Sequence, residues 1–183
     1  MKIKINQGQH VFYRNNKYID DIEFVVLNSL VDIDSIDNNL NHIIVRCSCY
    51  CISANLLKEQ MPFDINNHND WNTSSLKKYL NEEYIKRFSK EDLVQSDGDL
   101  ITLLSKEEVE RYEDILPEYS TFWWTRSAYF YSAYYAWFVN PSGQLNDSGL
   151  AAFAHGVIPA CIFNLNNLTI SQEENNIIFE SKN

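Results

Sequence analysis

The segment Phe122-Trp123-Trp124-Thr125-Arg126-Ser127 combines two adjacent tryptophans with an arginine two residues later. If the segment is a strand, Trp123 and Trp124 point to opposite faces, and each buries a large apolar area on its own side. Arg126 projects to the same face as Trp124, where its planar guanidinium can bind a carboxylate or backbone carbonyls. The segment therefore predicts a core strand that can flank a recognition surface, and it contains no recognisable catalytic constellation.

Upstream of this strand, the sequence predicts helices. Thr73 or Ser74 can cap the first one. Its apolar face is formed by Leu76, Leu80, Tyr84 and Phe88. A second helix begins at Ser105-Lys106-Glu107-Glu108, which matches a capping box. Because short strands rich in tyrosine, phenylalanine, alanine and serine follow these helices, the chain is predicted to be an α+β domain.

The rest of the sequence predicts strands that are separated by polar turns. These elements are a hairpin at 9–19 turning at Asn15-Asn16, a strand at 23–31, a loop at 32–41, a strand at 43–52, a turn at 140–143 that joins strands 135–139 and 144–146, and a returning core strand at 159–165. In the tail, Ile177-Ile178-Phe179 is expected to add an edge strand, and the rest of 171–183 is expected to be frayed.

Three cysteines alternate along the predicted strand at 43–52. Period-two spacing places Cys47, Cys49 and Cys51 on one face, about 6.5–7 Å apart, at the limit of disulfide reach. We expect them to be small buried hydrophobes in a reducing compartment. A soft-metal site that adds Cys161 is the alternative, and the lack of a nearby histidine and the close spacing argue against it.

Composition excludes several classes of function. The 183 residues fit one domain, and the net charge of −10 argues against non-specific nucleic-acid binding. Neither a signal sequence nor an 18-residue apolar span is present, so we expect a cytoplasmic protein without membrane contact. Phosphate-loop and dinucleotide glycine patterns are absent, and no cofactor is expected.

Five motifs in order resemble a domain family of unknown function, DUF6273. They are Ile22–Leu27, Trp71–Asn81, Leu103–Val109, the segment that contains Trp123-Trp124-Thr125-Arg126-Ser127, and Gly156-Val157-Ile158-Pro159-Ala160. The resemblance spans residues 20 to 166. One departure is Ile158, which occupies the position of an arginine in the family's Gly-Val-Arg-Pro segment.

This resemblance implies a C-type-lectin-like fold, with two or three helices packed on a twisted, mostly antiparallel sheet. It implies one domain at 1–166 with an N-terminal hairpin, followed by a tail at 167–183. Arg126 is then either a buried structural residue or a ligand anchor, and Glu23 of the first matching strand is the expected partner. Because Ile158 replaces the arginine, we expect it to pack among apolar side chains.

The aromatic density after the tryptophan pair indicates a binding surface. Tyrosine and serine together provide rigid contact area and adaptable hydrogen bonds, as in antibody paratopes. The predicted binding residues are Arg126, Tyr129, Tyr131, Tyr134, Tyr135, Trp137, Asn146 and His155. Calcium-dependent sugar binding is disfavoured, because Asp147 is the one carboxylate near Asn140-Pro141 and Asn146.

The sequence thus predicts a non-enzymatic module that binds a protein partner or a small-molecule ligand through residues 128–155. A second hypothesis is an acidic inhibitor from a phage or mobile element that blocks a host protein, which the charge and the asparagine-rich composition favour. A third is an enzyme on the fold of formylglycine-generating enzymes, with His155 and Cys161 as its first candidates. The sequence leaves the target and the oligomeric state open.

Overall fold

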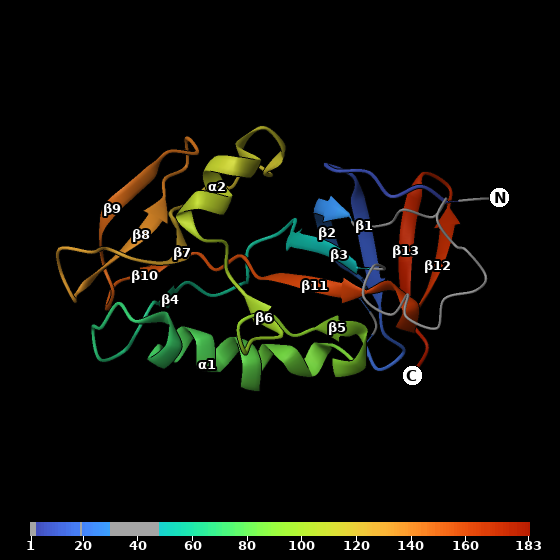
Figure 1. Ribbon diagram of the computed structural model, residues 1–183, viewed down its shortest axis with the longest axis horizontal. Helices are drawn as coiled ribbons and strands as arrows, with labels where there is room; N and C mark the ends of the chain where they lie inside the picture. Colours follow the sequence, from blue (N-terminus) through green and yellow to red (C-terminus); the bar gives the residue numbers. More distant parts are fainter. Residues whose placement is uncertain (1–2, 19, 30–47) are drawn as a thin grey trace, which may run out of the picture.

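The structure is a computed structural model that describes residues 3–18, 20–29 and 48–183, and its fold is mixed α+β and mostly sheet (Figure 1). The main sheet comprises β1 (His10–Arg14), β2 (Ile22–Ser29), β3 (Ser48–Ser53), β5 (Leu93–Val94), β6 (Ile101–Thr102), β11 (Ala160–Asn164), β12 (Leu168–Glu173) and β13 (Asn176–Ser181). Its order is β12-β13-β1-β2-β3-β11-β5, and β6 also pairs with β11. The β1–β13 pair is parallel and the other pairs are antiparallel.

Two smaller sheets lie at the opposite end of the molecule from β12 and β13 (Figure 1). One is the antiparallel set β7 (Trp123–Ala128), β8 (Tyr135–Val139) and β9 (Leu145–Leu150), and the other pairs β4 (Met61–Pro62) with β10 (Ala154–His155). The predicted turn between β8 and β9 is confirmed, and Gly143 adopts a φ of 82° there. Gly149 is required in β9, because an added Cβ would lie 2.6 Å from the Trp124 ring.

Two short α-helices lie on opposite sides of the main sheet: α1 (Ser75–Glu82) and α2 (Lys106–Tyr112) (Figure 1). Ser74 caps α1 by accepting a hydrogen bond from the Lys77 amide. At α2, the capping box of Ser105 and Glu108 forms as predicted. No helix in the described parts of the chain is long and apolar enough to cross a membrane.

The first predicted helix is shorter than expected. After Glu82 the chain continues as a 3-10 helix, Tyr84–Arg87, and Phe88 ends it in an extended conformation. The four residues of the predicted apolar face are nevertheless all buried. The tighter winding brings the Phe88 ring to a stacked contact 5.0 Å from Tyr13 of β1, so packing against the sheet overrides the regular helical period.

Successive side chains of each strand point to opposite faces of the main sheet, so the core is divided into two clusters, one on each face. Phe24 of β2 belongs to a large cluster with Leu76 and Leu80 of α1, whereas Val25 belongs to a smaller cluster with Val109 of α2. The tryptophan pair follows the same rule. Trp124 packs in the first cluster and Trp123 in the second, so the prediction that each buries on its own side is confirmed.

Two predictions about buried residues can be compared with these clusters. Ile158 is 1 % exposed within the smaller cluster, so the prediction that it packs among apolar side chains is confirmed. Cys49 and Cys51 both lie in the larger cluster, where Cys161 joins them, and all three are free thiols. Cys47 and the predicted loop at 32–41 lie outside the described residues.

The C-terminal tail is an ordered part of the main sheet. Residues 177–179 lie within β13, which sits between β12 and β1 and is therefore an interior strand rather than the expected edge strand. Phe179 is fully buried, and its ring contacts Phe163 at 5.4 Å. The expectation of frayed residues was wrong for β12 and β13, because their apolar side chains cover the end of the larger core cluster.

The N-terminal hairpin is larger than predicted. β1 pairs with β2, so the second arm begins at Ile22 rather than within residues 9–19. Asn15 starts the turn: its carbonyl accepts from the Tyr18 amide and its side-chain oxygen accepts from the Lys17 amide. The hairpin extends to β2 because β2 is buried and apolar, so it pairs with β1 better than the mostly polar residues 15–18 would.

Candidate functional site

The loop between β7 and β8 carries most of the predicted binding residues. A hydrogen bond from the Tyr129 amide to the Tyr135 carbonyl, 2.9 Å long, closes it. Phe130 is 90 % exposed and Tyr131 is 82 % exposed. We call residues 129–135 the aromatic loop. Large apolar rings held in solvent on a closed loop are unusual, because burial would remove their apolar surface from water.

Asn69 holds the aromatic loop from inside. Its side-chain amide nitrogen lies 3.1 Å from the Tyr129 carbonyl oxygen and 2.7 Å from those of Ser132 and Tyr135. Its backbone amide donates to the Ala133 carbonyl at 2.9 Å. Since a side-chain amide has two hydrogens, the three carbonyls share them. One buried asparagine therefore fixes the path of the whole loop.

The aromatic rings of this region form a continuous cluster. Phe130 contacts Tyr131, Tyr131 contacts Tyr129, and Tyr129 contacts Trp137 of β8, with ring centroids 5.3, 5.7 and 6.3 Å apart. The Lys106 ammonium lies 5.1 Å from the centroid of the Trp137 ring, in cation–π geometry. These four rings, the aromatic cluster below, run from the half-buried β8 strand out to the tip of the loop.

The remaining predicted residues divide between two places. Tyr134 and Tyr135 are exposed on the aromatic loop. Asn146 lies opposite Phe138 in the β8–β9 pair and hence shares its face, while His155 packs 4.3 Å from the Trp124 ring and 5.1 Å from the Phe138 ring. The structure therefore brings Tyr129, Tyr131 and Trp137 together and places Asn146 and His155 with a different group of rings.

Removing the Asn69 side chain should loosen the aromatic loop without unfolding the protein. In Asn69→Ala, three carbonyls lose their common donor, and we expect a cost of about 1–2 kcal/mol and faster amide exchange at residues 129–135. Hydrogen–deuterium exchange measures this directly. Asn66→Ala is the matched control, because Asn66 lies in the same chain segment as Asn69, between β4 and the 3-10 helix at Trp71–Thr73, and is exposed. Equal exchange in the two variants would show that the loop does not depend on Asn69.

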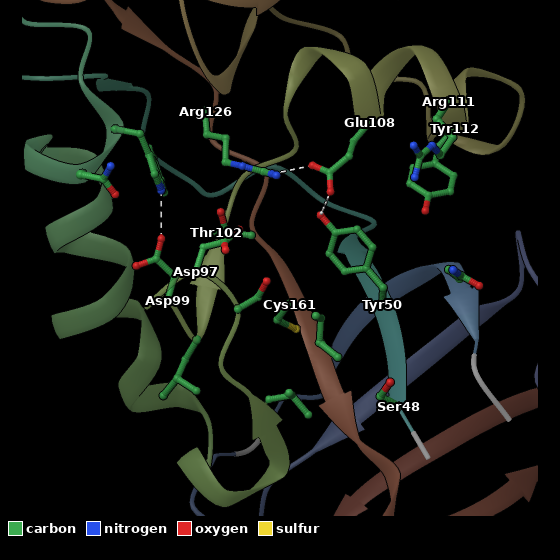
Figure 2. Close-up of a pocket in the computed structure, with 17 residues that line it drawn as sticks. Ser48, Tyr50, Asp97, Asp99, Thr102, Glu108, Arg111, Tyr112, Arg126 and Cys161 are labelled. Carbon is green, nitrogen blue, oxygen red and sulfur yellow. Dashed lines mark hydrogen bonds and ion pairs between the residues drawn. The ribbon is translucent and has the colours of Figure 1, made fainter. Parts of the chain in front are cut away.

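Arg126 lies apart from the aromatic loop, in a cavity of about 320 Å³ beside the main sheet (Figure 2). Residues from α2, β3, β6 and β7 line it, together with the turn after β5 and a 3-10 helix at Trp71–Thr73. In Figure 2, Asp97 and Asp99 lie on the side of α1, Tyr50 and Tyr112 lie on the opposite side, and Arg126 reaches toward Glu108 between them.

Arg126 binds both a carboxylate and a carbonyl, as the sequence indicated, but its partner is not Glu23. Its Nη1 donates to Glu108 Oε2 and to the Leu103 carbonyl. Glu23 instead accepts from His10 and from the Asn55 amide. The prediction of Glu23 was wrong because the capping glutamate of α2 lies closer, and its carboxylate can serve the helix and the arginine together.

Tyr50 completes this group. Its hydroxyl donates to Glu108 Oε1 at 3.2 Å. Burial and the Glu108 carboxylate raise the pKa of Tyr50, so its phenol stays protonated at neutral pH. Burial lowers the pKa of Arg126, the ion pair with Glu108 raises it, and the result is a pKa above the ordinary value. Arg126 therefore stays charged at neutral pH.

A second charged pair lies across the cavity. The Asp99 carboxylate is buried, accepts from the Trp71 indole at 2.9 Å and binds the Lys77 ammonium at 2.9 Å. The turn that positions Asp99 contains Asp97 and Gly98, both with positive φ. The Trp71–Asn81 motif was recognised in the sequence, but the contact between Trp71 and Asp99 was not predicted, because it joins residues 28 positions apart.

The described residues contain no group of three or more potential metal ligands. Burial raises the pKa of the Cys51 and Cys161 thiols, which favours the protonated, unreactive form. Burial also lowers the pKa of His155, whose Nδ1 lies 2.9 Å from the Ala154 carbonyl. The first candidates for enzyme chemistry are therefore a neutral thiol in the core and a neutral imidazole among aromatic rings.

Comparisons with known proteins identified no relative of this chain. No protein-family model, no curated protein and no solved structure matches the chain.

Proposed function

We propose that this protein is a non-enzymatic binding module that recognises a protein partner through the aromatic loop. The observation that carries the proposal is the exposure of Phe130 and Tyr131 on a loop that Asn69 fixes in place. Tyrosine and other aromatic side chains dominate protein interfaces because they bury a large area at low entropic cost. A loop that is ordered before binding also lowers the entropy lost on association.

The shape of this surface favours a protein over a small molecule. Small-molecule sites are concave, whereas Phe130 and Tyr131 stand out from the surface at the tip of the loop. In the aromatic cluster, the two exposed rings can insert into a partner, and Tyr129 and Trp137 support them from below. This matches the pattern in which a few aromatic anchors supply most of the binding free energy.

Alanine substitutions in the aromatic loop should weaken the binding of the partner strongly. We expect Phe130→Ala and Tyr131→Ala each to weaken binding by about 30-fold or more, which is the usual effect of an aromatic anchor. The partner is identified by co-purification from the source cell and mass spectrometry, and its affinity for each variant is then measured by calorimetry.

Phe153→Ala is the matched control for this experiment. Phe153 is 60 % exposed, and in the described parts of the chain it makes no ring contact with the aromatic cluster. This variant should bind like the wild type. Equal affinity of wild type, Phe130→Ala and Tyr131→Ala would refute the proposal.

The inhibitor hypothesis differs from this proposal in its salt dependence. An acidic protein that occupies a basic host surface loses affinity steeply as salt rises, whereas aromatic anchors are much less sensitive. A weak salt dependence of the captured complex is expected here. A steep one would favour an acidic surface of this chain, which has a net charge of −10, over the aromatic loop.

We further infer that the resemblance to DUF6273 and to C-type-lectin-like domains reflects a common architecture. The motifs that carry it contact one another: Glu108 of the Leu103–Val109 motif binds Arg126 of the tryptophan motif. In the Trp71–Asn81 motif, the Asn81 side-chain oxygen accepts from the Leu100 and Ile101 amides. These contacts support structural roles for the motif residues, and none of them involves the aromatic loop.

A further inference from the structure

The cavity around Arg126 offers hydrogen-bond donors that no residue in the described parts of the chain uses. Both hydrogen bonds of the Arg126 guanidinium use Nη1. No residue in the described ranges forms a hydrogen bond with its Nε or Nη2, although the side chain is only 26 % exposed. A guanidinium has five N–H donors, so this one can still bind an acceptor that enters the cavity.

The charges in the cavity determine which acceptor it favours. Glu108 neutralises Arg126, and Lys77 neutralises Asp99. Asp97 and Arg111 also line the cavity with opposite charges, so the lining as a whole has little net charge. A ligand carboxylate or phosphate beside Arg126 would also lie near the Glu108 carboxylate and be repelled. A neutral carbonyl oxygen accepts from the free N–H groups without that repulsion. The electrostatics therefore select an uncharged ligand that carries a carbonyl.

The shape and lining of the cavity favour a flat, partly apolar molecule. Trp71 lines one side and Tyr50 and Tyr112 line another, and Leu100 and Ile162 add aliphatic surface. Aromatic side chains provide stacking surfaces for planar rings. The volume of about 320 Å³ is at the small end of ligand pockets, which suits a ring system of one or two rings.

We propose that this cavity binds an uncharged planar heterocycle with a ring carbonyl, of the kind found in oxo-purine and oxo-pyrimidine nucleosides. The carbonyl accepts from Arg126, and the ring lies between the aromatic walls. The site shares no lining residue with the aromatic loop, so it goes beyond the proposed recognition of a protein partner. The two activities can be lost independently.

The test uses inosine, uridine and adenosine as probes, with binding measured by calorimetry and thermal shift on the full chain. Inosine and adenosine have the same size, but only inosine has a ring carbonyl. We expect saturable binding of inosine and uridine, and adenosine should bind about tenfold or more weakly, because it leaves the Arg126 donors unpaired. Adding a phosphate to inosine should not improve binding.

Two variants locate the site. Val94→Trp should abolish inosine binding, since Val94 is 37 % exposed and lines the cavity. Ile65→Trp should leave binding unchanged, because Ile65 is exposed and does not line the cavity. Arg126→Lys keeps the charge for Glu108 but removes the planar donors, so the preference for inosine over adenosine should disappear. Absence of saturable inosine and uridine binding, equal affinity for adenosine, or unchanged binding in Val94→Trp would each overturn the proposal.

Discussion

Ile158→Arg is expected to destabilise the protein by about 2–4 kcal/mol. Ile158 is 1 % exposed, and the buried cluster around it includes residues from β2, β3, β7 and α2 and contains no acidic side chain, so a guanidinium there would be buried without an acidic partner. In the DUF6273 resemblance this position holds an arginine, and the substitution would nominally restore the motif. The packing around Ile158 predicts the opposite effect on stability.

Thermal unfolding decides this prediction. For a chain of this length, each kcal/mol lost corresponds to a decrease of about 2–4 °C in Tm. Ile65→Arg is the matched control, because Ile65 is 72 % exposed and an arginine there keeps its hydration, so a change below about 0.5 kcal/mol is expected. An Ile158→Arg variant that melts at or above the wild-type temperature would mean that a carboxylate is available near this position.

Glu108→Ala should be similarly damaging, by about 2–4 kcal/mol, because one carboxylate serves three partners. Glu108 Oε2 accepts from the Ser105 amide at the start of α2 and from Arg126, and Oε1 accepts from Tyr50. The substitution therefore removes a helix cap and leaves a half-buried guanidinium without its counter-charge. Chemical denaturation measures the loss.

Glu107→Ala is the control for this prediction. Glu107 is in the same first turn of α2, but its side chain is 61 % exposed, and among the described residues it forms an ion pair with Lys106 alone. An exposed pair of this kind contributes at most about 1 kcal/mol. If Glu108→Ala were no more destabilising than Glu107→Ala, the capping glutamate would not be the structural partner of Arg126.

Local signals in the sequence predicted the parts of the fold that depend on neighbouring residues. The capping box at Ser105 and the opposite burial of Trp123 and Trp124 follow from spacing within one element, and both are confirmed. The α+β class followed from the same kind of pattern. The burial of Ile158 among apolar residues could be predicted because an isoleucine cannot pair with a buried charged group, and an unpaired buried charge is costly.

Contacts between distant segments could not be predicted in this way. β13 pairs in parallel with β1, although most of the chain separates the two strands in sequence. The Ile177-Ile178-Phe179 sequence fits an edge strand and an interior strand equally well. The role of Asn69 had no signal, because it lies in a polar loop without periodicity. Glu108 was recognised as a cap, but its second contact with Arg126 depends on how α2 packs against β7.

An amide-exchange footprint of the protein in complex with its captured partner tests directly whether the aromatic loop is the recognition surface. If the aromatic loop is the recognition surface, exchange at residues 129–135 should slow on binding more than anywhere else in the chain, since the interface excludes water from the amides around Phe130 and Tyr131. Strong protection at another surface, with residues 129–135 exchanging as in the free protein, would contradict the account.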